Sequence, residues 1–234
     1  MSEPGVEPHG ELVQLAPGLH VVDGEWGPLR RRMTVMEAGG ALAVHSAMRL
    51  GAGEMARLDA LGPVRWVLVP NRYHASDAAW YAERYPAARL LVPARARAAL
   101  EKERVGPIAG THEADWPPEL AGSIERAALD GLRLLHEVVF LHRATRTLVL
   151  CDLAFNLRGE DLPWAFRQAM RLNGAVDRFG PTRFFRAAVL RDRRALAASL
   201  RPVLAWDFDR VIVSHGRVLE TGGQESMGAA FGGW

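Results

Sequence analysis

The chain has 234 residues, of which 49% are hydrophobic and 24% charged, and its formal net charge is +2. This size and apolar content support a large buried core. Its single cysteine, Cys151, excludes an intramolecular disulfide and a multi-thiolate metal cluster. The sequence begins without a signal-peptide pattern, and it has no apolar run of the roughly 18 residues needed to span a bilayer. We therefore expect one globular domain over residues 1–234, in the cytoplasm and away from membranes.

The basic residues are nearly all arginines, with Lys102 as the only lysine. Arginine clusters occur at 30–32 and around 191–194, but no aromatic residues interleave with them as in a groove for single-stranded nucleic acid. We interpret these clusters as a solvated arginine face. Nucleic acid is therefore a disfavoured partner, and a small molecule is the expected one.

The first 45 residues are typical of strands joined by tight turns. Pro17-Gly18 and Gly39-Gly40 separate short apolar runs, and glycine can adopt the positive φ that such turns require. The expected strands are 12–15, 19–22, 33–37 and 41–45.

From residue 53 the pattern alternates between helical and strand periods, which predicts parallel strands covered by helices. We expect a helix from residue 53, a strand at 66–69, a helix at 77–85, a strand at 89–92 and a helix at 94–103. Residues 105–123 contain Gly106-Pro107 and Pro117-Pro118 and are expected to form a surface loop.

The second half repeats this order of strands followed by helix and strand. We expect strands at 124–129, 132–135, 138–142 and 147–151, a helix at 163–172, a helix capped by Asp192, and a strand at 210–213. Pro202 should break or kink the Asp192-capped helix near its end. Trp80, Trp164 and Trp206 are expected to be core anchors.

Three strands end in polar residues, which is where open α/β sheets bind ligands. Their segments are Pro70-Asn71-Arg72-Tyr73-His74, Leu150 to Asn156 with Asp152, and Ser214-His215-Gly216. Together with 137–143 and 205–210, they resemble the metallo-β-lactamase superfamily. They are more closely similar to a bacterial branch of it defined only as a domain of unknown function. The resemblance implies an α/β fold with four αββα layers and mixed sheets.

The chain departs from the superfamily's metal motif, so the motif is degenerate. Asn71 and Tyr73 stand where the first two histidines of the signature loop belong, and Ala75 and Ser76 stand where its Asp-His pair belongs. His74 matches only if the register shifts by one residue. The histidine before the Asp strand is also missing, and Leu135-His136-Glu137 occupies that neighbourhood. Asp152 and His215 fit their counterparts.

The retained residues suggest a reduced, mononuclear metal site. His74, Asp152 and His215 could hold one Zn, Fe or Mn ion through two imidazoles and a carboxylate. Further candidates to line or supplement the site are Asn71, Tyr73, Asp77, His136 and Glu137. In the alternative interpretation no metal is bound, and these groups hydrogen-bond one another to hold the strand ends together. We interpret Cys151 as a buried structural thiol, because it points away from the face of Asp152.

The resemblance implies a metal-dependent hydrolase of an ester, thioester, lactone or phosphoester. A second hypothesis is a non-catalytic, metal-free descendant that binds a small anionic ligand or a protein partner. The two hypotheses differ chiefly in whether His74 faces Asp152 and His215. The sequence does not predict an oligomeric state.

Overall fold

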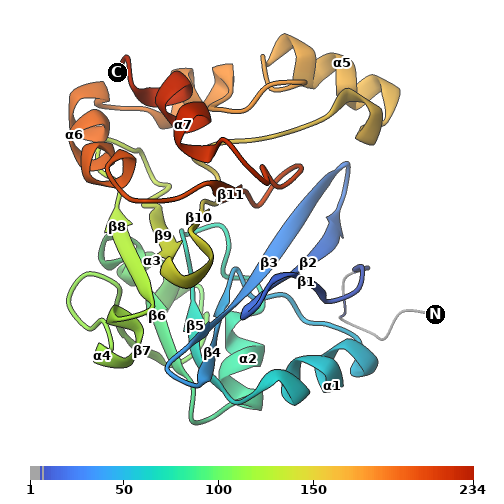
Figure 1. Ribbon diagram of the computed structural model, residues 1–234, viewed down its shortest axis with the longest axis vertical. Coiled ribbons are helices and arrows are strands. Elements are labelled where there is room, and N and C mark those ends of the chain that lie inside the picture. Colours follow the sequence, from blue (N-terminus) through green and yellow to red (C-terminus); the bar gives the residue numbers. More distant parts are fainter. Residues whose placement is uncertain (1–5, 7) are drawn as a thin grey trace.

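The computed structural model describes residues 6 and 8–234, apart from the side chain of Trp26. Seven strands form one sheet in chain order. Figure 1 labels them from β1 to β7. They are β1 (Val13–Ala16), β2 (Leu19–Trp26), β3 (Leu29–Ala38), β4 (Ala41–His45), β5 (Val64–Leu68), β6 (Arg89–Val92) and β7 (Ile108–Thr111). The strands from β1 to β4 are antiparallel and those from β4 to β7 are parallel. The change occurs after the Gly39-Gly40 turn, where the expected βα alternation begins.

A second, four-stranded sheet has the order β11 (Arg210–Ile212), β10 (Thr147–Val149), β9 (Val138–His142) and β8 (Ile124–Ala128). Strands β8, β9 and β10 are antiparallel, whereas β10 and β11 are parallel. The parallel pair places the carboxyl ends of β10 and β11 side by side. Both sheets are mixed.

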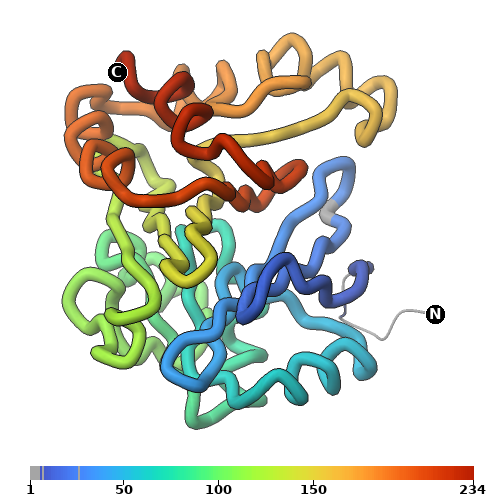
Figure 2. Tube along the Cα trace, in the orientation of Figure 1, coloured from blue at the N-terminus to red at the C-terminus, as the bar shows by residue number. Residues whose placement is uncertain are grey.

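Helices cover the outer faces of both sheets. Buried side chains of α1 (Ala52–Leu61), α2 (Ala78–Arg84) and α3 (Arg97–Lys102) share a core with the first sheet. Those of α6 (Arg193–Leu204) and α7 (Gly223–Phe231) share a core with the second. A third core, including Met36, Leu68 and Phe140, lies between the sheets. These cores give the four αββα layers that the resemblance implies, with the C-terminal part of the chain gathered at one end of the molecule (Figure 2).

The remaining helical segments are short or lie at the edge of the fold. They are η1 (Ala94–Ala96), α4 (Pro118–Ala121), η2 (Arg143–Thr145), η3 (Gly159–Asp161), α5 (Trp164–Leu172) and the π-helical η4 (Phe185–Val189). Within the described residues, none of the helices has the length and apolar character required to cross a bilayer.

Two sequence expectations are wrong in the region between and after the sheets. Residues 105–123 do not form only a loop, because Ile108–Thr111 pairs with β6 as an edge strand and Pro118–Ala121 forms α4. The expected strand at 132–135 is absent apart from an isolated bridge between Leu132 and Leu190. Leu134 and His136 have φ of 61° and 53°, values that a strand cannot accommodate.

Two expectations about the later helices also need correction. Pro202 does not break helix α6, which continues for two residues beyond it to Leu204; so near the helix end, little of the helix depends on the turn that the proline ring disturbs. Its predicted cap is confirmed, since Asp192 accepts a hydrogen bond from the Ala195 N–H at 3.0 Å. Trp164 is not a core anchor but is 72% exposed. It lies on a helix that packs only through partly buried residues such as Phe166.

Candidate metal centre

Four strands from the two sheets bring polar residues to one edge of the molecule. In the first sheet, Ser46 follows β4, and the loop after β5 carries Asn71 and His74. In the second sheet, Asp152 follows β10 and His215 follows β11. Because neighbouring parallel strands end at the same edge, residues far apart in the chain meet there.

The structure brings His74, Asp152 and His215 together as a potential metal site. Nε2 of His74 lies 3.5 Å from Oδ2 of Asp152, and Nε2 of His215 lies 3.2 Å from Oδ1. One ligand atom from each residue lies within 4.8 Å of the others. Metal bonds of about 2.0–2.1 Å in a tetrahedral arrangement place ligand atoms about 3.3–3.4 Å apart. The two imidazole–carboxylate distances match this spacing, so the group could hold one small divalent ion.

Nδ1 of each imidazole, the nitrogen that faces away from Asp152, has a hydrogen-bond partner in the protein. Nδ1 of His74 lies 2.9 Å from the hydroxyl oxygen of Ser46, and Nδ1 of His215 lies 2.7 Å from the backbone carbonyl of Arg30. A carbonyl oxygen only accepts, so neutral His215 carries its proton on Nδ1 and has a lone pair on Nε2. This arrangement is typical of histidines that bind metals.

Asn71 positions the carboxylate of Asp152. Its side-chain NH₂ donates to Oδ2 of Asp152 at 2.8 Å, and its oxygen accepts the Tyr73 N–H at 2.8 Å. The second bond fixes which end of the amide faces Asp152. Asn71 therefore contacts the carboxylate of Asp152 through its amide and belongs to the surroundings of the three residues.

Glu137 holds the backbone at Asp152 from within the protein. It is fully buried, and its two oxygens accept the backbone N–H groups of Cys151 at 2.8 Å and Asp152 at 2.9 Å. Burial and the neighbouring Asp152 carboxylate raise the pKa of Glu137 to about 8. Burial also raises the pKa of Asp152, but His74 and His215 outweigh it and hold this pKa well below its usual range.

Other sequence candidates lie outside the three-residue group. Asp77 forms an ion pair with Arg31 at 2.7 Å. His136 belongs neither to the metal-binding group nor to the pocket lining among the described residues. Cys151 is buried, and burial followed by the Asp152 charge raises the pKa of its thiol, in keeping with a structural role.

The three donors form the floor of a pocket of about 230 Å³. Tyr73, the other sequence candidate on this loop, lies along its wall. The wall also contains Phe155, Phe185 and Val189, which the sequence did not suggest. An ion held by this donor set could polarise a group bound in the pocket, next to its apolar wall.

Sequence reasoning also missed Ser46. It follows the strand 41–45 directly, so it is a fourth polar strand end of the kind that identified Asp152 and His215. Its φ of 53° is unusual for a residue other than glycine and turns the chain toward His74. No local sequence pattern identifies the residues of the pocket wall, because their segments come together only in the folded chain.

Comparison with known protein families and with curated proteins gave no match. Solved structures do match. A metallo-β-lactamase from Pontibacter korlensis aligns with a TM-score of 0.63 and 10% identity, over 96% of this chain and 99% of that chain. The metallo-β-lactamase FIM-1 from Pseudomonas aeruginosa in its mono-zinc form aligns with a TM-score of 0.59 and 11% identity, over 92% and 91%.

A metal-soaked flavodiiron core from Synechocystis is also similar, with a TM-score of 0.64 and 14% identity over 95% of this chain and 60% of that chain. Identities this low speak for the fold and not for the activity. The chain has the metallo-β-lactamase fold, with a potential His-Asp-His metal site at the edge where the two sheets end.

Proposed function

We propose that this chain is a metal-dependent hydrolase whose single ion is held by His74, Asp152 and His215. The observation that carries the proposal is the convergence of these three donors, each from a different strand end, at the floor of a pocket. The fold adds support, since one structural neighbour is described in a mono-zinc form.

The donor set of two imidazoles and one carboxylate suits Zn²⁺, Fe²⁺ or Mn²⁺. When bound, such an ion supplies Lewis-acid chemistry, which polarises a carbonyl or phosphoryl oxygen and lowers the pKa of water. The substrate is an ester, thioester, lactone or phosphoester. For a carboxylic ester, the oxygen of water bonds to the acyl carbon, the bond between that carbon and the leaving oxygen breaks, and the leaving oxygen takes up a proton.

The chain's own residues keep the donors in place without the histidines that the motif has lost. Asn71 and Glu137 fix Asp152 through its carboxylate and its backbone N–H. Ser46 and the Arg30 carbonyl fix the two imidazoles. Donors oriented in this way lose little conformational freedom when an ion binds.

The proposal also covers the family branch, the partner and the cellular compartment of the chain. We further propose that the chain belongs to the bacterial branch with the degenerate metal motif and that it acts on a small molecule. The lone Cys151, which is buried, is in keeping with a reducing cytoplasmic compartment.

Metal analysis of the purified protein tests the proposal directly. After supplementation with Zn²⁺, Fe²⁺ or Mn²⁺ and removal of excess ion, we expect about one ion per chain for one of these metals. The Asp152→Ala and His215→Ala variants should lose it. His136→Ala and Asp207→Ala are matched controls, because they remove the same residue types outside the donor group.

A substoichiometric metal content in the wild-type protein after supplementation would overturn the proposal. So would equal metal content in the wild type and in both donor variants. Either result favours the metal-free alternative, in which the three residues hold the strand ends together and the pocket binds a ligand without catalysis. A thermal shift with metabolites but with none of the metals would support that alternative.

A further inference from the structure

The pocket above the three donors is mainly apolar. Its inner wall contains Leu135, Phe155, Phe185 and Val189, and its volume is about 230 Å³. These residues come from three segments, namely the turn before β9, the segment after β10 and the π-helix η4. The apolar surface is therefore assembled by the fold around the donors.

The wall begins directly at the metal-binding group. The ring of Phe155 stacks on the ring of His215, with centroids 5.3 Å apart and an interplanar angle of 12°. Phe185 is 3% exposed and belongs to η4, whose π turn is closed by the hydrogen bond from the Leu190 N–H to the Phe185 carbonyl at 2.8 Å. A group bound next to the donors would thus lie directly against the packed aromatic side chains of the wall.

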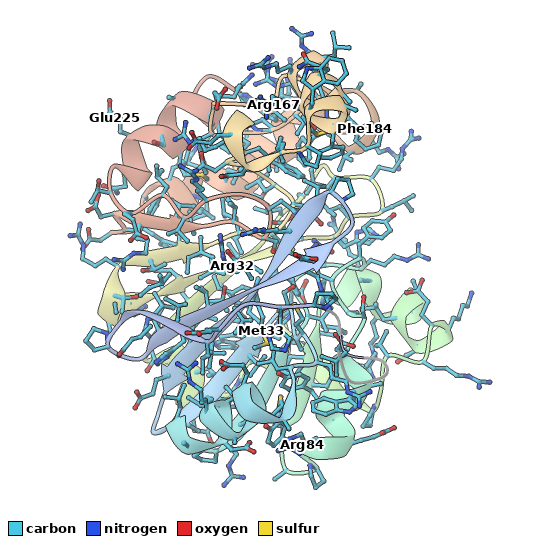
Figure 3. All side chains as sticks on the ribbon, turned by 90° about the vertical axis from the view of Figure 1, so that its right-hand side faces the viewer. Arg32, Met33, Arg84, Arg167, Phe184 and Glu225 are labelled. Atoms are coloured by element: carbon cyan, nitrogen blue, oxygen red, sulfur yellow. The ribbon has the colours of Figure 1, made fainter. Side chains whose placement is uncertain are left out.

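The mouth extends this apolar surface outward. Phe184 is 64% exposed and Tyr73 is 58% exposed, and both lie along the pocket. Figure 3 shows Phe184 at the same end of the molecule as Arg167 of α5. Large apolar side chains exposed beside a pocket enlarge the area that an apolar ligand can cover.

The charges around the pocket disfavour a phosphate group. Among the described lining residues, Arg31 is the one arginine or lysine, and it is bound to Asp77 at 2.7 Å. The carboxylate of Asp152 lies on the floor. Beyond the proposed metal ion and the histidines that hold it, the wall does not offer the several cationic groups or bidentate arginines that phosphate sites typically present.

We infer that the substrate is an uncharged carboxylic ester, thioester or lactone whose apolar acyl chain fills this pocket. The inference rests on the proposed function and narrows it. A cavity of about 150 Å³ holds benzene, so a pocket of this size accommodates a chain of about six to ten carbons. The phosphoester is the member of the proposed substrate class that the pocket fits least.

A chain-length series measures the preference. With the metal-loaded protein, kcat/KM should rise at least tenfold from p-nitrophenyl acetate to p-nitrophenyl octanoate, and p-nitrophenyl phosphate should be slower than either. Full burial would contribute about fourfold per methylene, which sets the upper limit. Val189→Trp, which fills the inner wall, should reduce the octanoate-to-acetate ratio. Leu172→Trp makes the same kind of change at an exposed apolar residue outside the pocket and should leave the ratio unchanged.

Binding of octanamide separates this inference from the proposed function. By calorimetry, octanamide should bind at least tenfold more tightly than acetamide to the wild type and to Asp152→Ala, and less tightly to Val189→Trp. Binding of octanamide without stoichiometric metal would overturn the hydrolase proposal but support the apolar pocket. Stoichiometric metal with no chain-length effect on binding or kcat/KM would overturn the pocket inference alone.

Discussion

The buried histidine His45 makes the stability of the fold depend on pH. It ends β4, is 1% exposed and packs edge to face against Phe140, with ring centroids 5.5 Å apart. Neither of its ring nitrogens has a hydrogen-bond partner among the described residues. Burial, aided by the charges of His74 and His112, lowers its pKa from 6.5 to about 3.

The sign and size of the effect follow from proton linkage. The pKa of His45 is lower in the folded state, so the unfolded chain binds the proton first and stability is lost as pH falls below 6.5. Between pH 7.5 and 5.0 this single histidine costs about 2 kcal/mol of the free energy of unfolding. His112, whose pKa burial lowers to about 4, adds a further loss of about 2 kcal/mol over the same interval.

Replacing His45 by leucine, which has a similar volume, tests this reasoning. Urea unfolding at pH 7.5 and 5.0, with a chelator present to remove any metal contribution, should show a loss that is about 2 kcal/mol smaller in His45→Leu than in the wild type. His20→Leu is the control, because His20 is only half-buried and should have a smaller effect. Equal losses in the wild type and His45→Leu would refute the reasoning.

Three further substitutions test the supports of the site and the fold. Ser46→Ala removes the oxygen beside Nδ1 of His74 and should weaken metal affinity by about 10–100-fold in chelator competition, with an unchanged circular dichroism spectrum; unchanged affinity would exclude a positioning role. Glu137→Leu leaves the buried N–H groups of Cys151 and Asp152 without their acceptors, so the free energy of unfolding measured in urea should fall by about 1–3 kcal/mol; no loss would show that these bonds contribute little. Asp192→Ala removes the cap of α6 and should lower the free energy of unfolding by about 1 kcal/mol in the same assay. Asp192→Asn keeps a capping oxygen and should lower it much less.

The sequence predicted the strands that local signals define. The run 89–92 forms β6 with the expected bounds, and Gly39-Gly40 joins β3 to β4, because turn residues and apolar runs act over a few neighbours. Helix α7 was not predicted, since Gly223–Phe231 contains glycine and alanine at several positions and its periodicity is weak. Its stability depends on packing against α6, which no local pattern encodes.

The site was predictable where it consists of polar strand ends. Asp152 and His215 were found in this way, and Ser46 carried the same signal after strand 41–45. His74 was a candidate from the same kind of strand end, but the motif alignment places it one residue out of register, and only the structure shows that its ring lies next to Asp152. The pocket wall could not be predicted, since Phe155 and Val189 become neighbours of the site only through the arrangement of both sheets.

The contact between His215 and the Arg30 carbonyl has a consequence for how this protein can evolve. The acceptor is a main-chain atom, so substitution of the Arg30 side chain leaves it in place as long as the β2–β3 hairpin keeps its course. The tautomer of His215 thus depends on the course of the backbone and not on which side chain stands at position 30. A lineage can exchange many side chains around such a histidine and still transmit its orientation, which is how a motif can become hard to recognise while the geometry that it served persists.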